Sequence, residues 1–214
     1  LYIVKHSGSR HLGKEVTEYY LREGQKFLKE RGEQLPYEMT YLEEGLMEDY
    51  LHDLKIVQEF ARLNREAILD ELARGMKWKI EKVVSSSHNY VEISGDSRIL
   101  RKGAVSARKG EDIILPINMR DGVLLGTGLG NTDWNESAPH GAGRILRRED
   151  VKNRYTVSAF RQVMKGVYSS CIGKETLDEA PFAYRGMEEI INAVADTMEI
   201  TEILKTVYNY KAGK

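Results

Sequence analysis

Residues 112–128 read DIILPINMRDGVLLGTG. Two apolar runs, DIILPIN over 112–118 and GVLLGTG over 122–128, stand on either side of a short polar segment. Short runs rich in β-branched residues and bounded by Gly, Asp and Asn are typical of strands. The segments WKIEKVV (78–84), NYVEIS (89–94) and RILRKGAVSA (98–107) share this character. We therefore predict a mixed or antiparallel sheet in the middle of the chain.

Before these strands, apolar residues recur at helical spacing. The pattern predicts one helix over residues 12–32 and a longer one over 43–74, with Gly75 as its stop. Pro36 lies in the connector between them and breaks any continuous helix. The first helix is expected to pack through Val16, Tyr19, Tyr20, Phe27 and Leu28, and the second through Leu46, Tyr50, Leu54, Val57, Ala61, Ile68 and Leu72.

The remaining segments complete the expected element order. The opening LYIVK reads as a strand, and its abrupt start suggests a chain cut from something longer or paired with something absent. After a Gly- and Asn-rich loop over 128–144, short helices are expected near Arg148, over 156–167 and over 186–198, and a final helix-to-strand element over 202–211. The whole reads as one α+β domain over 1–214, with helices grouped before and after a central sheet.

The amino-acid composition limits the classes of partner and the cellular compartment that we expect. The 214 residues carry 32 basic and 33 acidic side chains, so the net charge of −1 requires any anion site to be local. No apolar run approaches the roughly 20 residues that span a bilayer, and no signal peptide is visible. The one cysteine, Cys171, excludes an internal disulfide framework and suits a reducing compartment, so we expect a cytoplasmic protein.

The segment SAPHGAGR, 137–144, places His140 in a loop of small residues that ends in Arg144. Glycine lets the backbone adopt unusual angles and lets a ligand approach the main chain. One interpretation is a turn that carries a surface histidine. The other is a nucleophilic or phosphate-facing histidine, with phosphate oxygens held by the backbone of Gly141–Gly143 and negative charge stabilised by Arg144.

Two further histidines stand near strand ends. His6 follows the first expected strand, and His88 lies between two others, so both could converge on one metal such as Mn, Zn or Fe. Each taken singly is more often structural. His11 and His52 receive no role, and the only thiol, that of Cys171, is distant in sequence.

A set of motifs in fixed order makes the chain resemble one family. They are HSGSRHLG (6–13), SSHNYVEI (86–93), LRKGAVSA (100–107), LPINM (115–119), SAPHGAGR (137–144) and DEAPFAYR (178–185). This order resembles the RtcB RNA ligases. The resemblance implies a tRNA-splicing or RNA-repair ligase that joins an RNA 3′-phosphate or 2′,3′-cyclic phosphate to a 5′-hydroxyl, using GTP and Mn²⁺.

The resemblance also implies roles for individual residues. His140 would be the nucleophile that carries GMP, and His6 and His88 would ligate Mn²⁺. The nucleotide would lie along Asn89, Pro116, Ile117, Asn118, Met119, Gly141, Ala142, Gly143, Tyr184 and Lys211. Contacts to RNA phosphate are expected from Arg10, Arg101, Lys102 and Arg144.

The chain departs from the family pattern in two ways. Neither the D-x-x-C-G motif nor the G-N-H motif of the family's upstream half occurs, so we expect weak Mn²⁺ binding and inefficient guanylylation by these residues alone. The upstream half or a second copy is the expected partner. Leu100 replaces a family histidine, and LPINMR replaces I-P-G-S-M-G. Two alternatives stay open: a catalytically incomplete nucleotide- or RNA-binding fragment, and a metal-dependent phosphoesterase.

Overall fold

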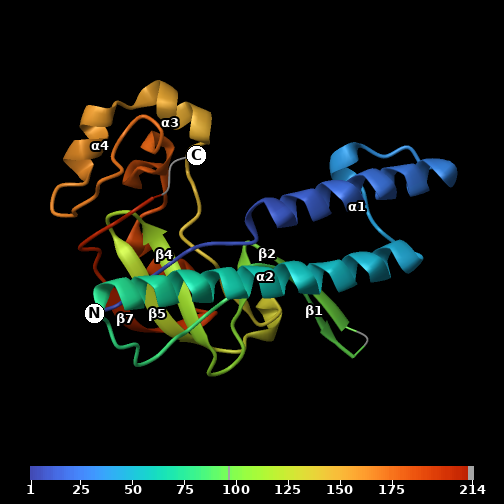
Figure 1. The fold of residues 1–214 in the computed structure, drawn as a ribbon, viewed down its shortest axis with the longest axis horizontal. Helices are drawn as coiled ribbons and strands as arrows, with labels where there is room; N and C mark the ends of the chain where they lie inside the picture. The colour runs from blue at the N-terminus through green and yellow to red at the C-terminus, as the bar shows by residue number, and fades with distance from the viewer. Residues whose placement is uncertain (96, 212–214) are drawn as a thin grey trace. The chain divides into compact units, whose positions relative to one another are not determined.

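The computed structural model describes residues 1–95 and 97–211, which form two compact units, Leu1–Val83 and Val84–Lys214 (Figure 1). Helices and antiparallel strands both contribute, which confirms the α+β class and the grouping of helices before and after the strands. The single domain expected over 1–214 stays a prediction. No helix in the described part of the chain is both long and apolar enough to cross a bilayer.

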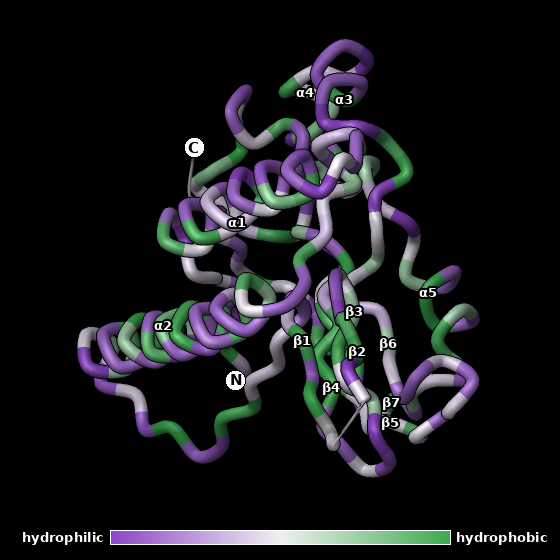
Figure 2. The backbone as a smooth tube through the Cα atoms, turned by 90° about the vertical axis from the view of Figure 1, so that its right-hand side faces the viewer, coloured by the Kyte–Doolittle hydropathy of each residue, from purple (hydrophilic) through white to green (hydrophobic). Residues whose placement is uncertain are grey.

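The first unit is a helical hairpin. It consists of α1 (Arg10–Glu30), the short helix η1 (Tyr37–Met39) and α2 (Glu44–Met76), which confirms both expected helices and their connector. Along both helices, apolar stretches alternate with polar ones in Figure 2, as amphipathic helices require.

The two helices pack through a small set of buried groups. Tyr20 and Leu28 of α1 and Val57 of α2 are buried, and the Tyr20 hydroxyl donates to Asp53 Oδ2 at 2.8 Å. Burial first, and the Asp53 carboxylate second, raise the pKa of Tyr20 well above its usual range. Tyr19, which the helical spacing assigned to the packed face, is instead 48% exposed.

Three local expectations of the first part of the chain are wrong. Residues 1–5 and residues 78–84 form no strand, because no other described strand pairs with their backbones. Gly75 lies inside α2, which ends at Met76 because Lys77 adopts a left-handed conformation with φ of 56°.

The second unit contains all seven strands of the described chain. They are β1 (Asn89–Ser94), β2 (Ser97–Lys102), β3 (Ala104–Ser106), β4 (Asp112–Asn118), β5 (Gly122–Gly128), β6 (Ser137–Pro139) and β7 (Met198–Leu204). They pair as β1–β2, β3–β6 and β4–β5–β7, each time antiparallel. The sequence segments 112–118 and 122–128 are thus confirmed as strands, whereas the segment 98–107 divides at Gly103 into two.

Short helices lie between β5 and β7 along the chain. They are η2 (Thr132–Trp134), α3 (Arg148–Arg154), α4 (Val157–Val163), η3 (Leu177–Glu179), η4 (Pro181–Ala183) and α5 (Met187–Ala193). The helices expected near Arg148, over 156–167 and over 186–198 are confirmed with shorter bounds. The helix-to-strand element expected over 202–211 is wrong, because β7 already begins at Met198 and ends at Leu204.

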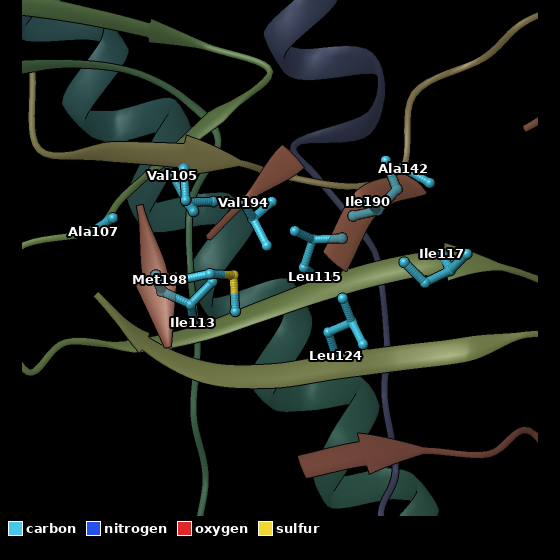
Figure 3. Packing of buried hydrophobic residues seen from close by; sticks show 11 residues of the cluster. Val105, Ala107, Ile113, Leu115, Ile117, Leu124, Ala142, Ile190, Val194 and Met198 are labelled. Carbon is cyan, nitrogen blue, oxygen red and sulfur yellow. The ribbon is translucent and has the colours of Figure 1, made fainter. Parts of the chain in front are cut away.

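Two apolar cores hold the second unit together. In the first, Leu115 of β4 and Leu124 of β5 are fully buried and pack with Ile190 of α5 and with Val194 just beyond it (Figure 3). The second gathers Phe160 of α4 and residues from α3, η3 and η4. Burial of side chains this large supplies the main stabilisation of such a unit.

Candidate functional site

His140 follows β6 directly, and the pairing of β6 with β3 decides what it contacts. Ala104 is the partner of Pro139, so His140 lies opposite Gly103. Its backbone N–H donates to Gly103 O at 3.4 Å, and its ring Nδ1 lies 2.6 Å from the same oxygen. A carbonyl oxygen only accepts, so Nδ1 carries the proton. The lone pair of a neutral His140 ring is therefore on Nε2.

Gly103 connects His140 to the start of β1. Its N–H donates to His88 O at 2.7 Å and to Asn89 Oδ1 at 3.2 Å. Its φ of +68° favours glycine, and a Cβ there would lie 3.4 Å from two atoms of the His140 ring. Sequence reasoning missed this residue, although a glycine that interrupts a β-rich run is a signal for close backbone approach.

The structure thus brings together three of the expected site residues, His88, Asn89 and His140. The rings of His88 and His140 lie with centroids 4.6 Å apart and planes tilted by 37°. His6 belongs to the first unit, where the neighbouring Ser7 accepts a hydrogen bond from Asn64 Nδ2 at 2.9 Å. The convergence of His6 and His88 on one metal stays a prediction.

A resident metal ion needs more donors than these residues supply. Over residues 1–95 and 97–211, no group of three or more His, Cys, Asp or Glu side chains is arranged to hold a metal ion. Transition-metal sites in proteins are usually completed by at least that many protein ligands. Mn²⁺ as a cofactor therefore stays a prediction.

The loop after His140 is fixed to β4. Ala142 is 4% exposed, and its N–H donates to Pro116 O at 3.1 Å. The expectation that all amides of Gly141–Gly143 face a phosphate is therefore wrong for Ala142, whose N–H is already bonded. The amides of Gly141 and Gly143 stay candidates.

The segment expected to line the nucleotide is largely structural. Ile117 is 2% exposed and Met119 is 4% exposed, and each packs in one of the two cores, so neither side chain is available to a ligand. Asn118 caps the following turn through its side-chain oxygen, which accepts from Arg120 N at 3.0 Å. Pro116 keeps an exposed ring. Of this segment, Pro116 is the residue left for a nucleotide contact.

Arg144 is held by the protein around it. Its Nε donates to Leu146 O at 3.2 Å, its Nη1 to Tyr184 Oη at 3.1 Å and its Nη2 to Asp178 O at 2.6 Å. The guanidinium carbon lies 5.0 Å from the centre of the Tyr184 ring. Further N–H groups of the same guanidinium remain for a phosphate. Arg144 therefore connects the His140 loop to the DEAPFAYR segment, and its contact with RNA stays a prediction.

Glu179 joins two of the residues expected along the nucleotide, Tyr184 and Lys211. Its carboxylate accepts from the Tyr184 hydroxyl and binds Lys211 Nζ at 3.0 Å and Arg148 Nη1 at 2.7 Å. Burial alone would raise the pKa of Glu179, but the Tyr184 hydrogen bond and the Lys211 and Arg148 charges outweigh it and lower the pKa to about 2. Burial and the same carboxylate raise the pKa of Tyr184 to about 12.

Glu179 and Arg148 were not singled out from the sequence. The available signal was the acidic pair that opens DEAPFAYR, Asp178 and Glu179, both of which are buried. Because a buried carboxylate needs partners, these two residues indicated that cations from elsewhere in the chain would bind them. The sequence did not show which cations these are.

Of three further basic residues expected to contact RNA phosphate, one is buried and two are exposed. Arg101 is 1% exposed, lies 2.8 Å from Glu92 and donates to Ser137 Oγ at 3.2 Å, so it stabilises the sheets and does not face solvent. Lys102, the next residue along β2, is exposed, as is Arg10 in the first unit. Their contacts with phosphate stay predictions.

Comparison with known proteins adds the family. A family model described as "tRNA-splicing ligase RtcB" matches residues 1–212. The chain is 31% identical to RNA-splicing ligase RtcB of Escherichia coli K12, over 97% of this chain and 55% of that protein. It is 27% identical to RNA-splicing ligase RtcB2 of Escherichia coli over 91% and 50%, and 26% identical to tRNA-splicing ligase RtcB of Pyrobaculum aerophilum over 89% and 48%. The chain spans about half the length of these relatives.

Proposed function

The chain belongs to the RtcB family of tRNA-splicing ligases, and from this premise we propose that it supplies the nucleophile of an RNA ligase. The reaction would join an RNA 3′-phosphate or 2′,3′-cyclic phosphate end to a 5′-hydroxyl end. The observation that carries the proposal is the 2.6 Å contact between His140 Nδ1 and Gly103 O, which leaves the lone pair of the neutral ring on Nε2, the proposed nucleophile.

The proposed first step forms one bond and breaks one. His140 Nε2 attacks the α-phosphorus of GTP, a nitrogen–phosphorus bond forms, and the bond to the β-phosphate oxygen breaks to release pyrophosphate. The ring gains positive charge in this step, and Gly103 O stabilises that charge because it accepts the Nδ1 proton. Where the RNA end is a 2′,3′-cyclic phosphate, water first opens it to the 3′-phosphate. An oxygen of the 3′-phosphate then attacks the phosphorus of the guanylyl group, and the bond to His140 Nε2 breaks. The 5′-hydroxyl attacks the activated phosphate, loses its proton to solvent and releases GMP.

The guanine base belongs to the same proposal. We place Tyr184 at the base and Lys211 along the nucleotide; both bind Glu179, so one carboxylate holds the two side chains in a single cluster. The low pKa of Glu179, about 2, keeps this cluster charged throughout the neutral range. A positioned cluster of this kind costs less entropy on nucleotide binding than free side chains do.

Mn²⁺ stays part of the proposal with a restricted role. His88 and His6 are the ligands that this chain would offer, and Mn²⁺ would neutralise phosphate charge when bound. We assign no step to it, because the described donors do not complete a site. A cytoplasmic location belongs to the same proposal and is favoured by the single free thiol of Cys171.

Intact mass after incubation with GTP and Mn²⁺ tests the proposal, on this chain and on a version extended upstream. We expect a GMP-sized gain that His140→Ala abolishes. His52→Ala, which removes an exposed imidazole on α2, is the matched control and should keep the adduct. An adduct that survives His140→Ala would refute the nucleophile. No adduct on either wild-type version would favour a nucleotide- or RNA-binding protein, and hydrolysis of a cyclic phosphate without joining would favour a phosphoesterase.

A further inference from the structure

The first unit carries a groove that no step of the ligase reaction uses. It has a volume of ≈ 410 Å³ and lies between α1 and the connector that follows it. Its lining consists of Arg22, Gln25, Lys26, Lys29, Glu30 and Tyr37. All six residues lie within the helical hairpin, so the groove is a property of this unit alone.

Specific contacts hold the connector against α1 and shape the groove. Gln25 Nε2 donates to Thr40 Oγ1 at 2.7 Å and to Leu35 O at 3.3 Å. Gly24 lies so close to the connector that a Cβ there would be 2.8 Å from a Thr40 methyl carbon and 2.7 Å from a Leu42 methyl carbon. The connector therefore packs directly on the helix, and Tyr37, 45% exposed, forms one wall of the groove.

The groove is positively charged. Arg22, Lys26 and Lys29 follow one another at spacings of four and three residues, so they share one face of α1. All three are exposed, and none forms an ion pair with another described residue. Glu30 is the one carboxylate among the six lining residues.

Several other cations of the same hairpin form ion pairs. Lys14 pairs with Glu18 on α1 at 3.6 Å, and on α2 Arg62 pairs with Glu59 at 2.6 Å. Arg74 pairs with Glu71 at 2.9 Å. Among the described residues, three of the unpaired cations of α1 therefore lie together at the groove, whereas Arg10, at the start of the helix, is unpaired and lies outside it.

We propose that this groove binds a stretch of single-stranded RNA, with Arg22, Lys26 and Lys29 on successive phosphates and Tyr37 stacked on a base. A cationic groove beside an exposed aromatic ring is the usual arrangement for single-stranded nucleic acid. The proposal rests on the proposed function for the identity of the ligand. It assigns to the helical hairpin a substrate-holding role that is separate from the chemistry of His140.

Salt dependence tests the charge. Binding of a fluorescent single-stranded RNA of about 12 nucleotides is measured by anisotropy between about 50 and 200 mM salt. The logarithm of the association constant falls as the logarithm of the salt concentration rises, and each phosphate contact on a single strand makes this fall steeper by about 0.7. The triple variant Arg22→Gln, Lys26→Gln and Lys29→Gln should therefore show a slope that is shallower by about 2. The matched control removes the same charge from the compensated cations, as Lys14→Gln, Arg62→Gln and Arg74→Gln, and should leave the slope unchanged.

A second variant tests the aromatic wall. Tyr37→Leu should weaken RNA binding about tenfold with the salt slope unchanged, because stacking is lost and no phosphate contact is. A duplex RNA of the same length should bind the wild type more weakly than the single strand. Circular dichroism confirms that each variant retains its helices.

The outcomes separate this inference from the proposed function. An unchanged slope in the triple variant, an equal effect in the control, or stronger binding of duplex would overturn the groove assignment, even if His140 is guanylylated normally. A lowered slope without any guanylylation would support the groove and count against the ligase chemistry.

Discussion

Replacing Glu179 by glutamine removes one charge from a buried side chain at the centre of a polar cluster and keeps the shape of the side chain. The carboxylate binds Lys211 at 3.0 Å and Arg148 at 2.7 Å and accepts the Tyr184 hydroxyl. A neutral amide keeps one oxygen as an acceptor but cannot hold both cations. We expect Glu179→Gln to destabilise the second unit at neutral pH.

The size of the effect follows from the pKa of Glu179. Its depression from 4.5 to about 2 corresponds to about 3 kcal/mol, at about 1.36 kcal/mol per pKa unit. Lys211 and Arg148 keep 43% and 49% of their side chains exposed. Water therefore screens part of the interaction, and we expect a loss of about 2 kcal/mol in the free energy of unfolding.

The sign of the pH dependence is fixed by the direction of the shift. The pKa is lower in the folded state, so the stabilisation is complete above the unfolded pKa of 4.5 and is lost as the pH falls toward about 2. Wild type and Glu179→Gln should therefore differ most at neutral pH and converge in acid.

Urea unfolding of both proteins at about pH 7 and about pH 3 measures this difference. Glu175→Gln is the matched control, because Glu175 is exposed, lies four residues away and forms no ion pair with another described residue. A loss below about 0.5 kcal/mol at neutral pH, or an equal loss at both pH values, would refute the ionic role of Glu179.

Two further substitutions, one in each unit, test the packing. Tyr20→Phe removes the hydroxyl that donates to Asp53 at 2.8 Å, so the free energy of unfolding of the helical hairpin, measured in urea, should fall by about 1–2 kcal/mol. Tyr19→Phe, on the exposed side of the same helix, should change that free energy by less than about 0.5 kcal/mol. Phe160 is fully buried, so Phe160→Ala should cost about 3–5 kcal/mol, whereas Ile145→Ala, at a side chain 54% exposed, should cost less than about 1 kcal/mol. Equal losses within either pair would contradict the packing described here.

The failed strand predictions share one physical cause. LYIVK and WKIEKVV have the composition of strands, yet neither pairs with a described strand. A strand is stabilised by hydrogen bonds to a neighbour, and composition cannot reveal whether that neighbour exists. DIILPIN and GVLLGTG succeeded because they pair with each other across a short turn.

For the site residues, the sequence motifs identified which residue types were candidates. The tertiary contacts then decided which of these side chains face solvent and which are part of the core. Arg101 and Lys102 are adjacent and both basic, but only Arg101 points inward, where Glu92 binds it. Ile117 and Met119 lie in a motif that matches the family and are nevertheless core residues. Alternation along a strand sends neighbours to opposite faces, and only the fold shows which face is buried.

The sequence by itself determined the two long helices, the strand segments 112–118 and 122–128, the family and the identity of His140 as the candidate nucleophile, because periodicity and ordered motifs are local properties. Only the tertiary structure decided that Gly103 O holds His140 Nδ1 and that Glu179 gathers Tyr184, Lys211 and Arg148. These contacts join residues that are dozens of positions apart or lie on separate elements. They form because strand pairing and core packing bring distant backbone and side-chain groups within hydrogen-bond distance, which no local pattern encodes.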